Sequence, residues 1–124
     1  MALSIEIAKG EPGTYSVKLS GQLDTETAEQ LGIRMEEVWA DAKARAIRMD
    51  LHDLTYISSM GLGILAKIKY VLKSRGGAVV VVGMQPQIAR AFEIARILPK
   101  EIVFATREEA DAYLAAIEDQ VRNP

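Results

Sequence analysis

Apolar and polar positions alternate twice near the start of the chain, first over residues 3–7 and again over residues 15–19. A period of two is typical of a strand with one buried face. The intervening residues 9–13 (KGEPG) have the composition of a turn. The pattern therefore predicts an antiparallel pair of strands. Its buried positions are Leu3, Ile5, Ile7, Tyr15, Val17 and Leu19.

The spacing of apolar residues then changes to three and four, the period of an amphipathic helix. Asp24 or Thr25 can cap the first of these helices. A second helix opens at Ser58-Ser59 and ends at Arg75, where a basic last turn meets two glycines. The predicted buried positions of the two helices are Ala28, Leu31, Met35, Val38, Trp39 and Ala42, then Leu62, Ile64, Leu65, Ile68, Val71 and Leu72, with Ile33 on the opposite side of the first.

Further strands and helices alternate in the rest of the chain. Residues 46–51 predict a short strand, followed by a loop over 53–57 that leads into the second helix. Residues 78–82 (AVVVV) form an apolar, β-branched run without alternation, as in a strand covered on both faces. Residues 102–104 predict a last short strand.

Two more helices are predicted on either side of that last strand. One begins at Pro86, buries Ile88, Ala91, Phe92 and Ala95, and is broken by residues 98–100 (LPK). The other begins with a capping box between Thr106 and Glu109 and buries Ala110, Tyr113, Leu114, Ile117 and Val121.

The resulting order is β-β-α-β-α-β-α-β-α. An antiparallel pair followed by alternating strands and helices predicts an α/β fold with a mixed sheet and about four helices. The length of 124 residues suits one domain, and we assign residues 1–124 to it.

Composition narrows the function. The net charge of −2 shows no basic surplus for nucleic acid, so we expect no direct nucleic-acid binding. Without cysteine there is no disulfide framework and no thiolate metal site. The N-terminus does not resemble a secretory leader, and the apolar run 78–84 is far shorter than the ~20 residues of a membrane span. We therefore expect a cytoplasmic protein without membrane insertion.

The enzyme interpretations are weak. His52 is the only histidine, which leaves no His-based metal site, and Ser59 lacks the Gly-x-Ser-x-Gly context of a hydrolase nucleophile. Residues 61–63 (GLG) lack the further residues of a nucleotide loop. Asp50 suits the strand-end aspartate of a receiver domain, but the acidic pair of such domains is missing. We expect no enzymatic activity, no cofactor and no metal.

Residues 50–65 (DLHDLTYISSMGLGIL) resemble the signature of the STAS domain, which anti-sigma factor antagonists share with the cytoplasmic ends of sulfate transporters. Residues 21–24 (GQLD) resemble the earlier loop of that family, and residues 74–77 (SRGG) with 79–82 resemble its next strand. Residues 91–93 (AFE) and 106–110 are similar to its C-terminal helices. The resemblance covers nearly the whole chain.

The resemblance implies a switchable binding protein. In the family, an antagonist binds an anti-sigma factor, often a serine kinase, and thereby releases a sigma factor. The kinase then phosphorylates a serine at a helix start, and a serine phosphatase reverses this. Ser59 matches the accepting serine, and Ser58 stands where the family often has aspartate, which makes Ser58 the second candidate. Asp24, Ser58, Ser59, Met60 and Gly61 are the predicted partner-binding residues, and we expect a monomer when the protein is free.

Simpler roles for the same residues stay open. Ser58 or Ser59 can be only an N-cap, Asp24 can cap its helix or contact the partner, and Gly61 can be a packing glycine or one that permits a close approach. A second functional interpretation is a non-switching STAS scaffold in a stress-sensing or lipid-transport complex. A transporter end is less expected, because no membrane segment precedes the domain.

A phosphate at a helix start is physically suited to switching. The helix dipole and free N–H groups favour the added charge there, so the fold should tolerate it. Like charges about 4 Å apart near a protein surface repel by roughly 4 kcal/mol before screening. A hundredfold loss of affinity needs only about 2.7 kcal/mol.

Overall fold

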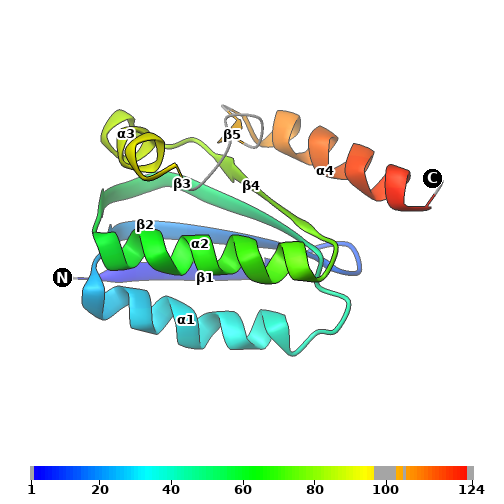
Figure 1. Cartoon of the computed structure of the whole chain (residues 1–124), viewed down its shortest axis with the longest axis horizontal. Helices are drawn as coiled ribbons and strands as arrows, with labels where there is room; N and C mark the ends of the chain where they lie inside the picture. Colours follow the sequence, from blue (N-terminus) through cyan, green and yellow to red (C-terminus); the bar gives the residue numbers. More distant parts are fainter. Residues whose placement is uncertain (1, 97–102, 105, 123–124) are drawn as a thin grey trace.

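Five strands form one mixed sheet in the order β1-β2-β3-β4-β5 (Figure 1). The computed structural model describes residues 2–96, 103–104 and 106–122, with side chains as far as residue 116 in the last helix. The strands are β1 (Leu3–Lys9), β2 (Thr14–Leu23), β3 (Ala46–Ile57), β4 (Ala78–Val82) and β5 (Val103–Phe104). The helices are α1 (Thr25–Trp39), α2 (Ser59–Ser74), α3 (Pro86–Ala95) and α4 (Arg107–Arg122).

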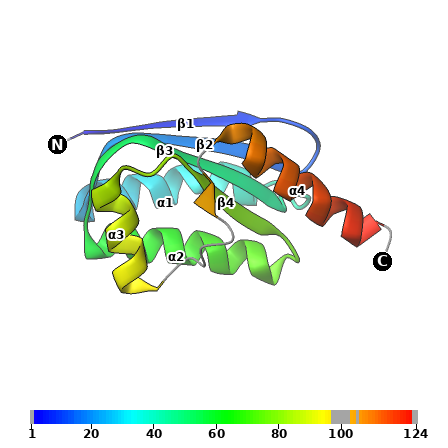
Figure 2. The same ribbon diagram turned by 90° about the horizontal axis from the view of Figure 1, so that it is seen from above.

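The sheet topology confirms the predicted mixed architecture. β1 and β2 are antiparallel, and the pairs β2–β3, β3–β4 and β4–β5 are parallel. Helices α1 and α2 lie side by side against one face of the sheet, whereas α4 crosses the other face and α3 packs against β3 (Figures 1 and 2). Among the described helices, none is long and apolar enough to cross a bilayer.

The core follows the periodicities of the sequence, except that Ala42, predicted as a buried position of the first helix, lies beyond the end of α1 and is exposed. In β2 the alternating Tyr15, Val17 and Leu19 are buried, and β4 buries four consecutive valines, as expected for a strand covered on both faces. Helix α1 buries Ala28, Leu31, Met35 and Val38, and α2 buries Leu65, Ile68 and Leu72. Ile33 is 60% exposed, as its place on the opposite side of α1 predicts.

The predicted loop over residues 53–57 is wrong. β3 continues through these residues to Ile57, and His52 lies within the strand rather than near its end. The extension is stabilised by β2, which runs parallel to it and pairs Gly21 with Leu54 and, after a register shift, Leu23 with Ile57. Leu54 is fully buried while its neighbours are exposed, so the segment carries too little alternation to predict a strand.

The third helix differs from its predicted apolar face at one position. Ile88 and Phe92 are buried, but Ala95 is exposed, because the helix ends there and Arg96 adopts a left-handed conformation with φ of 54°. The predicted break at residues 98–100 and the strand position Ile102 lie outside the described residues, as do the side chains of Ile117 and Val121.

Candidate functional site

The parallel pairing of β2 and β3 brings the starts of two helices together. Leu23 and Ile57 are partners at the carboxyl ends of these strands, and each is followed by a helix cap, Asp24 for α1 and Ser58 for α2. The backbone N–H of Ser58 donates to the carbonyl of Leu23 at 2.9 Å, which ties the two caps to one edge of the sheet. The predicted site residues therefore share one surface region.

The two adjacent serines have different roles. Ser58 is the N-cap of α2, and its Oγ accepts a hydrogen bond from the Gly61 N–H at 3.1 Å. Ser59 is the first residue of the helix and is exposed. Within the described residues its hydroxyl forms no hydrogen bond. Capping is thus assigned to Ser58, and the Ser59 hydroxyl is accessible from solvent.

The charge at the start of α2 suits an added anion. The first turn of the helix contains no acidic residue, so the positive end of the helix dipole is not neutralised from within the helix. The first N–H groups of a helix lack partners inside it. A phosphate on Ser59 would lie beside these groups.

Two large exposed apolar side chains lie within three residues of Ser59 in the sequence. Met60 is 57% exposed, and Tyr56, near the end of β3, is 49% exposed. Met60 was predicted from the sequence as a partner-binding residue. Tyr56 was missed because residues 53–57 were predicted as a loop, and a loop does not indicate which way a side chain points. The feature of the sequence that could have indicated Tyr56 is its position, as an aromatic residue two positions before the cap of α2. Large exposed apolar groups at an accessible helix start are typical of contact surfaces.

Asp24 caps α1 through a complete capping box. Its carboxylate accepts from the Thr27 N–H at 2.9 Å, and the Asp24 N–H donates to the Thr27 Oγ1 at 2.8 Å. The hydroxyl of Thr27, which is buried, also reaches the Gln22 carbonyl at 2.8 Å. The hydrogen bond from the Thr27 backbone holds the pKa of Asp24 below its ordinary value. Capping is therefore established for Asp24, and its contact with a partner stays a prediction.

The lowered pKa of Asp24 gives a pH-dependent stability. Because the pKa is lower in the folded state, the charged carboxylate stabilises the fold at neutral pH, and this contribution is lost as pH falls below the ordinary aspartate pKa and through the lowered one. Asp24→Asn can still cap the helix but cannot ionise. In urea unfolding we expect Asp24→Asn to be less stable than the wild type at pH 7, with the difference shrinking toward pH 3. An unchanged difference over this range would show that the charge of Asp24 has no role.

Gly61 permits a close approach between α2 and the end of β2. A Cβ at this position would lie 2.6 Å from the Leu23 carbonyl oxygen and 2.9 Å from side-chain carbons of Leu23 and Ile57. Gly61 is buried, and its N–H is the donor to Ser58. Of the two roles that the sequence left open, a packing glycine and a glycine that permits a close approach, the contacts favour the second. The glycine allows the capped first turn of α2 to sit directly on the strand end.

His52 belongs to a different cluster. Its Nδ1 lies 3.0 Å from the Asp50 carboxylate, and its carbonyl accepts from the Gln85 side chain at 3.0 Å. In the described part of the chain no hydrogen bond joins His52 to Ser59. That part also contains no cluster of His, Cys, Asp and Glu suited to a metal. Within the described residues, His52 and Ser59 therefore do not form the hydrogen-bonded pair that a serine hydrolase needs.

The family is established by comparison with known proteins. The STAS domain model matches residues 7–110, a stretch that includes β2, β3 and every predicted site residue. The chain belongs to the STAS domain family.

Its relatives include proteins named as regulators of sigma factors. The anti-sigma-B factor antagonist of Listeria monocytogenes is 29% identical over 94 residues, which cover 76% of this chain and 82% of that protein. The anti-sigma F factor antagonist of Paenibacillus polymyxa is 28% identical over 102 residues, covering 80% of this chain and 86% of the relative. The Bacillus cell fate determinant SpoIIAA, solved in its phosphorylated form, shares the fold with a TM-score of 0.73 at 19% identity, over 89% of this chain and 98% of that one.

Proposed function

We propose that this protein is an anti-sigma factor antagonist whose binding to its partner is controlled by phosphorylation of Ser59. The observation that carries the proposal is the division of roles between two serines at the start of α2. Ser58 caps the helix, which leaves the Ser59 hydroxyl exposed in a position favourable for a phosphate. The named functions of the Listeria and Paenibacillus relatives support the same assignment.

The contact surface consists of Asp24, Tyr56, Ser58, Ser59, Met60 and Gly61. Met60 and Tyr56 supply exposed apolar area for binding. Gly61 fixes the first turn of α2 against β2, so the surface is held rigidly by the sheet. Asp24 places a carboxylate beside the cap of α2. A phosphate added at Ser59 would have to be desolvated at the centre of this contact, which disfavours the complex.

The switch requires two further partners, a serine kinase and a serine phosphatase. In the proposed cycle the anti-sigma factor is itself the kinase. The unmodified protein binds it and frees the sigma factor. Phosphorylation of Ser59 ends the binding, and the phosphatase restores it. Ser58 is the weaker acceptor because its side chain is half-buried and its Oγ is engaged with the Gly61 N–H.

The acceptor site can be tested by mass spectrometry after incubation with ATP and the anti-sigma factor kinase that binds this protein. We expect one added phosphate on the wild type, mapped to Ser59, and none on Ser59→Ala. Ser58→Ala is the matched control. It loses the cap, at a cost of about 0.5–2 kcal/mol, but it should still be phosphorylated. A phosphate mapped to Ser58, or an equal mass gain in Ser59→Ala, would contradict the assignment of Ser59.

A further inference from the structure

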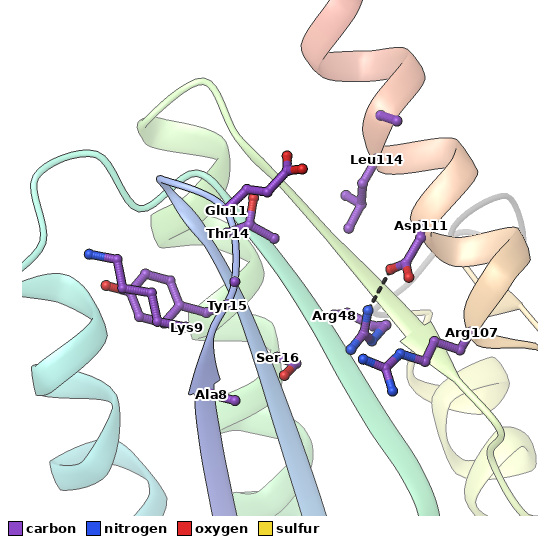
Figure 3. A pocket seen from close by; sticks show the side chains of 12 residues that line it. Ala8, Lys9, Glu11, Thr14, Tyr15, Ser16, Arg48, Arg107, Asp111 and Leu114 are labelled. Carbon is purple, nitrogen blue, oxygen red and sulfur yellow. Dashed lines mark hydrogen bonds and ion pairs between the residues drawn. The ribbon is translucent and has the colours of Figure 1, made fainter.

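A cavity of about 450 Å³ lies between α4 and the sheet, on the face opposite α1 and α2 (Figure 3). Its walls come from the turn between β1 and β2, from the first residues of β2, from β3 and from the first turns of α4. The volume falls within the range of about 300–1,000 Å³ that is usual for small-molecule sites. The charged groups that line it determine which ligand it would accept.

Two guanidinium groups and one carboxylate line one part of this cavity. Arg48 extends from β3, its side chain is only 14% exposed, and its Nη1 is paired with the Asp111 carboxylate of α4. Arg107, the first residue of α4, also lines the cavity and has no ion-pair partner among the described residues. Figure 3 draws both guanidinium groups at the same end of the cavity. That end therefore carries one uncompensated positive charge.

The remaining walls limit the size and charge of a ligand. Leu114 points into the cavity, and Ala8 and Ala115 add further apolar surface (Figure 3). Glu11 lies toward the other end, in the turn between β1 and β2. Asp111 is paired with Arg48, and Lys9, the other cation of the lining, is paired with Asp41. Glu11 would therefore repel a second negative charge on a ligand. The lining thus favours a single anionic group attached to a short apolar body.

We propose that this cavity binds a small monocarboxylate with a short apolar chain. The carboxylate would pair with the Arg107 guanidinium, whose planar fork suits bidentate binding, next to the Arg48–Asp111 pair. The chain would lie against Leu114 and Ala115. The site is separate from the proposed phosphorylation site. Arg48 lies near the start of β3, whereas Ser59 follows its end.

The proposal can be tested by NMR titration of the full chain with three six-carbon probes. Hexanoate carries one charge, adipate carries two, and hexanamide carries none. We expect saturable shifts of the Ser16 and Ala115 amides with hexanoate. Hexanamide should bind at least fivefold more weakly because it cannot form a charge-assisted hydrogen bond, and adipate at least fivefold more weakly because its second carboxylate is repelled by Glu11.

Two variants and a control locate the binding. Arg107→Gln should weaken hexanoate about tenfold, and Ala115→Glu, which adds a negative charge to the wall, should abolish binding. Arg90→Gln removes an exposed arginine from α3 and should change nothing. The absence of saturation with hexanoate, equal binding of hexanamide, or unchanged affinity in Arg107→Gln would overturn the proposal. None of these results bears on the Ser59 switch.

Discussion

Gly61→Ala should be the most destabilising single-methyl change at the site. The new Cβ would lie 2.6 Å from the Leu23 carbonyl oxygen, and a backbone carbonyl cannot move aside as a flexible side chain can. The first turn of α2 must then shift away from β2, which strains the hydrogen bond from the Gly61 N–H to Ser58. We expect a loss of about 1–3 kcal/mol in the free energy of unfolding, measured by urea denaturation.

Gly63→Ala provides the matched control, because it adds the same methyl group two residues further along the same helix. Gly63 is exposed, and a Cβ there would meet no atom within 4 Å. Alanine favours a helix over glycine by up to about 1 kcal/mol, so this variant should be more stable than the wild type. If both variants changed stability in the same direction, the close approach at Gly61 would not be the reason for its glycine.

Ser59→Asp should reduce the affinity for the anti-sigma factor by about tenfold while the protein stays folded. An aspartate at the start of a helix is favoured by the dipole, so the melting temperature should not fall. In the complex, however, the carboxylate would be buried without a partner, which costs free energy. The loss should be smaller than with phosphate, because aspartate carries less charge and fewer oxygen atoms. Binding is measured by isothermal titration calorimetry.

Two controls separate the charge at Ser59 from a general effect. Ser59→Ala adds no charge and should bind like the wild type. Ser74→Asp places the same new charge at the exposed last residue of α2, far from the proposed surface, and should also bind like the wild type. If Ser59→Asp bound as tightly as Ser74→Asp, a scaffold role with constitutive contacts would explain the surface better than a switch.

Much of the fold could be predicted because local periodicity reports burial directly. The alternation around Val17 and the helical spacing around Leu31 each identified an element whose apolar side is buried in the structure. The second half of β3 could not be predicted in this way. The residues on both sides of Leu54 are polar or exposed, so the sequence shows no alternation there. This part of β3 is a strand because β2 extends beside it and pairs with it. That pairing depends on residues far away in the sequence.

The candidate site was predicted only in part. The signature over residues 50–65 pointed to Ser59, but it could not divide capping between two adjacent serines, since either hydroxyl can cap a helix. In the structure α2 starts at Ser59, so Ser58 is the N-cap and accepts the hydrogen bond from the Gly61 N–H. A start one residue earlier or later would assign the cap to a different residue. Tyr56 could not be predicted as a surface residue of the site because its position follows from the extension of β3. The cavity near Arg48 depended on where α4 crosses the sheet, which the sequence pattern does not show.

The most direct test of the switch compares the unmodified protein with protein fully phosphorylated at Ser59. The dissociation constant of each form for the anti-sigma factor is measured under the same salt conditions. We expect the phosphorylated form to bind at least about a hundredfold more weakly, a difference of about 2.7 kcal/mol, with its fold intact by circular dichroism. Equal dissociation constants for the two folded forms would contradict the proposed control of binding by Ser59.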